Sequence, residues 1–284
     1  MKFLTILLST YIIYSQQDTE VYLFDYSNSK PLPILANPKN ISNNPGYDNQ
    51  PSFSKNGKFI YFSSTRNGQT DILRFDIKND KKKWISQTTG GEYSPQEISR
   101  NHLSAVRLDP DGKQLLYSYK ISRNHSKVLV ENKKIGYYAW INSKELLCFV
   151  LGEPNSLQSI NLKSNESILI DEIIGRSIHK IPNSKLMSYI SKKTDSWSIN
   201  SFDPVSKETS KIINTVKGSE DLTWTNNGVI LMSDGNSLFS FHPGYDKDWK
   251  FVIDFKEFDL TNISRISLDR GNNYIAIVAE AIKN

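Results

Sequence analysis

A unit of short strands separated by tight turns is the feature of this sequence that most constrains its fold. In the first clear copy, turns at residues 55–57 and 66–68 read Lys-Asn-Gly and Arg-Asn-Gly. Asn and Gly tolerate the positive φ angles of hairpin turns. The apolar runs at 59–62 and 72–75 are too short for helices and rich in aromatic and branched residues. They predict antiparallel strands joined by hairpins, with residues 84–86 as a fourth strand.

Copies of this unit recur at intervals of 41 to 45 residues through the rest of the chain. Turns equivalent to the one at Gly57 lie near His102, Lys144, Lys185, Gly228 and Gly271. An apolar run follows most of these turns. A period of this length with four strands per copy is typical of the blades of a β-propeller, in which each blade buries its faces against its neighbours.

The spacing predicts an all-β, six-bladed β-propeller of four-stranded antiparallel blades. Residues 17–284 provide about 45 residues for each of six blades. The C-terminal copy has room for only two strands, whereas residues 20–25 and 32–42 at the N-terminus have strand character without a partner. We therefore expect one blade to be closed by both chain termini, which would pair the edges of the ring.

The N-terminus predicts export of the protein. Residues 1–16 combine a short basic start, an apolar stretch and a small residue before Gln16, which is typical of a secretory signal peptide and too short for a spanning helix. The alternative is a buried N-terminal strand. Residues 17–284 then form a single propeller domain. No later apolar run approaches the length of a membrane span, so we expect a periplasmic or secreted protein.

Charge and cysteine content narrow the range of partners. The 35 basic residues barely exceed the 30 acidic ones and are spread along the chain, so nucleic acid is not an expected partner. The lysine run at residues 81–83 is expected in a solvated turn. The single cysteine, Cys148, lies in an apolar run and is expected to be a buried structural thiol. Packing between blades is the expected role of Trp140, Trp197 and Trp224.

Residues 49–72 resemble the repeat of the TolB-like propellers, which alternates Pro-led strands, Ser-Pro-Asp-Gly-type turns and a Ser-x-Arg-x-Gly-x-x-Asp hairpin. Here Lys55 and Asn56 stand where the family often has Pro and Asp, and three later copies lack the turn glycine. The resemblance implies a six-bladed exported bacterial protein that binds partners in the cell envelope. The same repeats also accompany a serine-hydrolase domain, for which this chain has no Gly-x-Ser-x-Gly. Arg66 and Asp71 match the hairpin motif and are expected to hydrogen bond to one another for structure.

A ligand site is predicted where six loops lead into the innermost strands, because such loops surround the mouth of the central channel. These loops are residues 45–49, 90–94, 134–138, 175–179, 217–221 and 260–265. They carry charged, histidine and aromatic side chains, which we expect to converge: Tyr47, Asp48, Glu92, Tyr93, Tyr137, Tyr138, Arg176, His179, Glu220, Asp221, Asn262 and Arg265. One interpretation is a pocket for a sugar, a peptide end or a small anion, with the two arginines as anion anchors and the tyrosines as stacking faces. The other is a set of ordinary solvated loops, with some side chains plugging the channel.

The predicted function is an exported binding or interaction module. Its expected partners are an envelope or secreted protein, or a small polar or saccharide ligand, and a monomer is expected. One alternative is a carbohydrate-active hydrolase or lyase at the same mouth, which needs carboxylates such as Glu92 and Asp221 about 5–10 Å apart. A second is a scaffold in an envelope or secretion complex. No catalytic residue, metal ligand or cofactor is assigned, since His-Glu-x-x-His, paired Cys and phosphate-loop motifs are absent. Calcium would require Asp48, Glu220 and Asp221 to converge.

Overall fold

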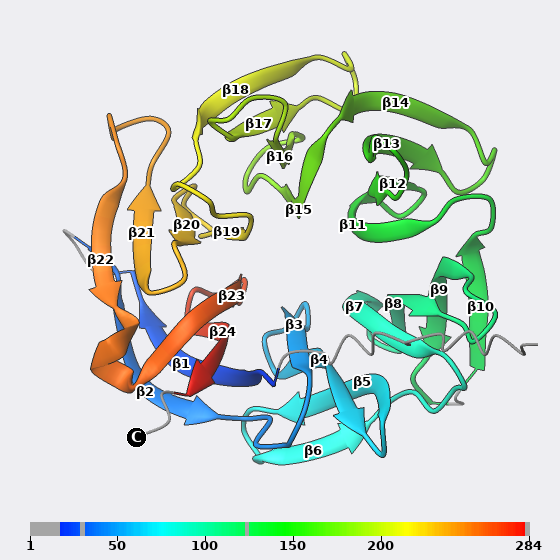
Figure 1. The fold of residues 1–284 in the computed structure, drawn as a ribbon, viewed down its shortest axis with the longest axis horizontal. Coiled ribbons are helices and arrows are strands. Elements are labelled where there is room, and N and C mark those ends of the chain that lie inside the picture. The colour runs from blue at the N-terminus through cyan, green and yellow to red at the C-terminus, as the bar shows by residue number, and fades with distance from the viewer. Residues whose placement is uncertain (1–17, 29–31, 123–124, 282–284) are drawn as a thin grey trace, which may run out of the picture.

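The computed structural model describes residues 18–28, 32–122 and 125–281, and it confirms the predicted propeller. Six four-stranded antiparallel sheets surround a central axis (Figure 1). The predicted signal peptide lies outside the described residues. Within the described part of the chain, no helix is long and apolar enough to cross a membrane.

Each blade runs from an inner strand to an outer strand, and five blades follow the chain in order. The first has β3 (Asp48–Phe53), β4 (Phe59–Arg66), β5 (Gln69–Asp76) and β6 (Lys81–Trp84). The second has β7 (Gly91–Ser99), β8 (His102–Leu108), β9 (Gln114–Lys120) and β10 (His125–Val130). The third has β11 (Ile135–Asn142), β12 (Glu145–Val150), β13 (Ser156–Asn161) and β14 (Ser167–Glu172). The fourth has β15 (Ile174–Lys180), β16 (Met187–Ser191), β17 (Ser198–Phe202) and β18 (Thr209–Asn214). The fifth has β19 (Leu222–Trp224), β20 (Ile230–Ser233), β21 (Ser237–Phe241) and β22 (Lys250–Asp254).

The sixth blade contains both chain ends, as predicted. Its inner strands β23 (Leu260–Leu268) and β24 (Tyr274–Ala281) follow a 3₁₀ turn at Phe255–Phe258. Its outer strands are β1 (Glu20–Ser27) and β2 (Ile34–Asn40), and β1 pairs antiparallel with β24. Side chains of β24 alternate between two cores, since Ile277 packs with the fifth and sixth blades and Val278 packs with the first blade.

The predicted turns form where Gly and Asn occupy the left-handed region. Gly57 has φ 68° between β3 and β4, and Asn67 has φ 49° between β4 and β5. The sequence predicted the fourth strand of the first blade at residues 84–86, about three residues too late in the chain. The structure forms it at β6, so the lysines 81–83 lie in an outer edge strand rather than in a turn. An edge strand accommodates lysine because its stem covers apolar surface while its ammonium group stays in water.

Two tryptophans join neighbouring blades, as predicted. Trp140 Nε1 donates to Ser104 Oγ at 3.0 Å, and Trp224 Nε1 donates to Ser188 Oγ at 2.9 Å. In each case an inner strand bonds to the second strand of the preceding blade. Cys148 is fully buried in the third blade, and burial raises the pKa of its thiol, which fits a structural role.

Removal of residues 263–284 is expected to unfold the domain. The truncation strips β24 from two cores, and each large apolar side chain contributes about 1.5–3 kcal/mol on burial. A typical domain has a total stability of about 5–15 kcal/mol. The truncation also leaves β1 without its partner strand, as an open apolar edge. Solubility and thermal melting of the truncated chain, beside the chain without residues 1–16, provide the measurement. A soluble truncation that melts cooperatively would show that the ends do not hold one blade together.

Candidate functional site

The segments predicted as loops at the channel mouth are mostly parts of the inner strands themselves. Five of the six contribute to β3, β7, β11, β15 or β23, and only residues 217–221 precede a strand as a loop. Each of these five strands has a register shift against its neighbour. A bulge bends a strand and re-aims its side chains. Polar residues at bulges therefore resemble loop residues in the sequence. For this reason the predicted boundaries between these loops and the inner strands were wrong.

An arginine spans the centre of the ring. Arg265 on β23 donates through Nη2 to the hydroxyl of Tyr137 on β11, at 3.3 Å. These strands belong to the sixth and third blades, on opposite sides of the axis (Figure 1). Arg176 on β15 donates through Nη2 to the carbonyl of Ser264 at 2.9 Å, and Arg265 Nη1 donates to the same carbonyl at 2.8 Å. Arg176 and Arg265, which with the charged side chains around them we call the arginine layer, therefore extend across the channel.

The arginine layer carries more positive than negative charge. Asp221 Oδ2 lies 3.5 Å from Arg265 Nε and 3.8 Å from Arg176 Nε, while Oδ1 accepts a hydrogen bond from the amide of Ile266 at 3.0 Å. Glu220 is held mainly by Lys192, at 2.6 Å, and lies 3.8 Å from Arg176. Three cations therefore face two carboxylates. Burial raises the pKa of Asp221, and the two guanidinium groups counteract this effect.

Tyrosines surround the arginine layer. Tyr47 and Tyr93 meet edge to face with ring centres 6.2 Å apart, and Tyr137 lies between Arg265 and Phe149. Burial raises the pKa of Tyr47, while Arg265 acts in the opposite direction, so both belong to one electrostatic cluster. The tyrosines offer aromatic faces and hydroxyl groups to a ligand.

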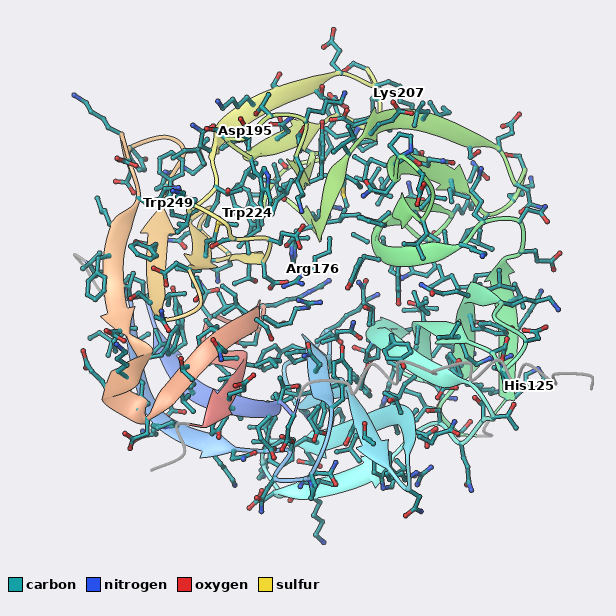
Figure 2. All side chains as sticks on the ribbon, viewed as in Figure 1. His125, Arg176, Asp195, Lys207, Trp224 and Trp249 are labelled. Carbon is teal, nitrogen blue, oxygen red and sulfur yellow. The ribbon has the colours of Figure 1, made fainter. Side chains whose placement is uncertain are left out.

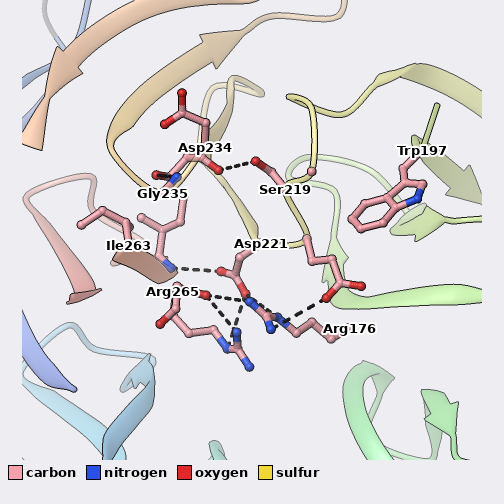
Figure 3. Close-up of a pocket in the computed structure, with 13 residues that line it drawn as sticks. Arg176, Trp197, Ser219, Asp221, Asp234, Gly235, Ile263 and Arg265 are labelled. Atoms are coloured by element: carbon pink, nitrogen blue, oxygen red, sulfur yellow. Dashed lines mark hydrogen bonds and ion pairs between the residues drawn. The ribbon is translucent and has the colours of Figure 1, made fainter. Parts of the chain in front are cut away.

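The arginine layer separates two cavities. A chamber of about 890 Å³ follows the inner strands from Arg176 and Arg265 to the exposed hairpin turns at Asn183, Asn226 and Arg270. A smaller pocket of about 230 Å³ lies on the other side, among the fourth, fifth and sixth blades. Four residues line both cavities: Arg176, Asp221, Arg265 and Ile266. Figure 2 shows Arg176 pointing into the centre of the ring, and Figure 3 shows the smaller pocket.

His179 lines the chamber wall. Its Nε2 lies 2.9 Å from Ser177 Oγ, and burial lowers the pKa of the imidazole to about 4. The ring is therefore neutral near pH 7 and offers the chamber a polar group without charge.

Two predicted site residues are structural carboxylates buried between blades. Asp48 is fully buried beside β1, where Oδ2 accepts from Asn44 at 3.2 Å. Glu92 is fully buried between the first and second blades, where it accepts from Ser86 at 3.0 Å and Tyr119 at 3.3 Å. Burial raises the pKa of each carboxyl to about 7. Both predictions of a mouth position were wrong, because Glu92 bonds across a blade interface and Asp48 is buried against the segment that precedes β3.

Two other predicted site residues make structural hydrogen bonds. Tyr138 lines the chamber, but it is buried and donates to Ser104 Oγ at 2.9 Å, which ties the third blade to the second. Asn262 is exposed at a strand end and donates to Glu280 at 3.0 Å. Tyr47 interacts electrostatically with both arginines, and Tyr93 packs against Tyr47. The remaining predicted residues line a cavity: Tyr137, Arg176, His179, Glu220, Asp221 and Arg265.

The positions of the carboxylates decide whether the residues proposed for a hydrolase or lyase, or for a calcium site, come together. Glu92 lines neither cavity, so the proposed acid pair with Asp221 is not formed at the channel. Asp48 likewise lies apart from the carboxylates of the arginine layer. The described residues contain no group of three or more His, Cys, Asp or Glu side chains placed to share a metal ion.

The Arg66–Asp71 hairpin pair has the structural role predicted for it. Arg66 Nε donates to Asp71 Oδ2 at 2.9 Å, and its guanidinium lies 4.2 Å from the Trp84 ring. Ser86 Oγ lies within hydrogen-bond distance of both Asp71 and Glu92. The motif therefore anchors one blade to the next.

Sequence reasoning missed Lys192. Trp197 packs against the core between the fourth and fifth blades, as predicted, and it also lines the smaller pocket. Lys192 follows β16 directly, and its ammonium group lies 3.8 Å from the centre of the Trp197 ring, which lines the smaller pocket. In an antiparallel blade, the end of the second strand lies beside the start of the first. The residue after each second strand is therefore a candidate site residue, and this rule finds Lys192.

The Glu92→Gln substitution is expected to flatten the dependence of stability on pH. The folded pKa of about 7 exceeds the ordinary value of 4.5, so between these pH values the folded state retains a proton that the unfolded state has released. Stability of the native protein should therefore fall as pH rises through this window. The variant should gain on the order of 3 kcal/mol relative to the native chain by pH 8, since the folded and ordinary pKa values differ by about 2.5 and one pKa unit is about 1.4 kcal/mol.

Denaturant unfolding from pH 4 to 8 measures this difference. Glu166→Gln, at an exposed turn, is the matched control and should leave the pH dependence unchanged. Parallel curves for Glu92→Gln and the native chain would show that Glu92 is ionised throughout the window.

Comparison with known proteins supports the fold. No known sequence family matches the chain, and no curated protein matches it either. Among solved structures, it is similar to a putative TolB from Agrobacterium tumefaciens, with TM-score 0.72, 11% identity, and coverage of 92% of this chain and 98% of that one. TolB from Acinetobacter baumannii gives TM-score 0.58 and 10% identity over 93% of this chain and 64% of that one. An oligogalacturonate lyase from Vibrio parahaemolyticus gives TM-score 0.61 and 10% identity over 91% and 86%. The chain therefore has the fold of the TolB-like six-bladed β-propellers, as its first repeat predicted.

Proposed function

We propose that this chain is an exported binding module that holds a carboxylate-bearing ligand in its central chamber. A propeller of TolB-like fold supports a binding or interaction role in general. Arg176 and Arg265 form the floor of the chamber, and their positive charge indicates that the ligand carries a carboxylate. The predicted signal peptide supports the exported location.

The observation that carries this proposal is the charge of the arginine layer. Lys192 satisfies Glu220, which leaves Asp221 as the nearest carboxylate for two guanidinium groups, at 3.5 and 3.8 Å rather than at hydrogen-bond distance. A second anion would complete the pairing. Charge–charge attraction is stronger in a partly desolvated site than in water, and Arg presents paired donors that match a carboxylate.

The chamber has the size and charge for such a ligand. Its volume of about 890 Å³ is within the range of roughly 300–1,000 Å³ that is usual for ligand sites. Among the described residues, five basic side chains line it against three acidic ones. Aromatic surface comes from Tyr137, Trp140 and Trp224. An acidic saccharide or the free end of an envelope or secreted protein has this chemistry.

The contacts of the chamber residues favour a site that binds its ligand without catalysis. The alternative function, a lyase, would also take an acidic saccharide as its ligand in this chamber, and one similar structure is an oligogalacturonate lyase. In this chain, Asp221 is engaged by two arginines and the Ile266 amide, and His179 is hydrogen bonded to Ser177. Both groups are tied into the wall rather than free to exchange protons with a ligand.

Arg176→Ala combined with Arg265→Ala is expected to abolish binding of carboxylates. A hydrogen bond to a charged group contributes about 1.5–3 kcal/mol, so affinity should fall by roughly a hundredfold or more for the pair. The probes are galacturonate, citrate and a short peptide with a free C-terminal carboxylate, each measured by thermal shift and calorimetry. The same peptide with an amidated C-terminus should bind weakly or not at all.

Arg100→Ala, at an exposed turn, is the matched control. The variant with Arg176→Lys and Arg265→Lys keeps the charge but loses the paired donors, and it should bind with intermediate affinity. The proposal fails if none of the three carboxylate probes binds the native protein, or if the double alanine variant folds and binds them equally well.

A further inference from the structure

The outer strand β14 is an edge without the usual protection against strand pairing. Each blade ends in an outer strand that pairs on one side only, which leaves backbone donors and acceptors on the other side. Soluble proteins commonly block such edges with lysine or proline. Among the described outer strands, β6, β10, β18 and β22 each contain lysine, and β2 contains both Pro38 and Lys39. The strand β14 reads Ser-Ile-Leu-Ile-Asp-Glu and contains neither.

Apolar side chains on β14 are also left in water. Ile168 is 47% exposed and Leu169 is 56% exposed, and Ile173, directly after the strand, is 47% exposed. We call these three exposed side chains the aliphatic strip; they lie on or directly after β14, which Figure 1 places on the outer rim of the third blade. Exposed apolar side chains beside an open edge are typical of a protein-interaction site.

A bulge at Ile170 does not explain the missing lysine. The register between β13 and β14 shifts at this residue, which can itself discourage pairing. Similar shifts occur in the outer pairs of the second, fourth, fifth and sixth blades, yet their outer strands carry lysine as well. The bulge is therefore a general feature of these blades, and the composition of β14 is what differs.

The negative charge around the aliphatic strip indicates that its partner carries positive charge. Glu166 and Glu172 flank it and are exposed, while Asp171 is already paired with Lys193. This acidic edge contrasts with the net charge of +5 for the whole chain. An antiparallel pair of two β14 strands would bring the acidic groups of both copies together, which opposes a symmetric dimer. The complementary strand is one that alternates apolar and basic residues.

We propose that β14 is a docking edge, at which an extended segment of another protein with alternating apolar and basic residues adds a fifth strand to the third blade. Main-chain hydrogen bonds supply affinity in this mode of recognition, and side chains on alternate positions supply specificity. The site is independent of the chamber, since none of its residues lines either cavity.

A synthetic ten-residue peptide that alternates valine and lysine tests this edge on the full chain. We expect it to bind, as measured by fluorescence anisotropy, and to slow amide hydrogen exchange across residues 167–172. Leu169→Lys should weaken binding at least tenfold. Val205→Lys, at a loop residue that is 73% exposed, makes the same change elsewhere and should have no effect. A peptide that alternates valine and glutamate should not bind.

Three outcomes would overturn the proposal. Binding of the valine–lysine peptide without protection of residues 167–172 would place its site elsewhere. Equal binding to the native chain and to Leu169→Lys would show that the strip is not used. Concentration-dependent dimerisation in analytical ultracentrifugation, lost in Leu169→Lys, would mean that a second copy of the chain covers the edge instead.

Discussion

The pairing of β1 with β24 is the interaction on which the rest of the molecule depends. Each blade buries its two faces only against its neighbours, so a ring with one blade incomplete has two unsatisfied faces. The N-terminal strand completes the blade that the C-terminus begins. All six inner strands then surround one axis, and side chains from opposite blades, such as Arg265 and Tyr137, come within hydrogen-bond distance.

The closed ring explains why a polar network can exist at its centre. Six inner strands converge on a narrow space, and bulges in five of them re-aim their side chains, several of which reach it. Charged groups there lose water, so their pairing matters more than it would at the surface. Arg176 and Arg265 are held by the carbonyl of Ser264 as well as by Asp221, and this arrangement fixes two guanidinium groups in advance of any ligand.

The fold was predictable from the sequence to a greater extent than the site. The interval between turns, together with the Gly57 and Gly68 hairpins, determined the number of blades and the shared sixth blade. The repeat placed twelve residues near the axis but could not say which way each one points. At an inner strand, a shift of one residue moves a side chain from the channel to a blade interface. Asp48 and Glu92 are buried away from the channel for this reason, whereas Arg176 and Arg265 reach the axis.

The arginine layer has one further consequence, because it is the wall that two cavities share. Arg176, Asp221 and Arg265 line the chamber on one side and the smaller pocket on the other. An anion bound in one cavity would neutralise part of the positive charge that the same guanidinium groups present to the other cavity. Binding at the two cavities would then be thermodynamically linked, and each occupant would change the affinity of the other by the same factor.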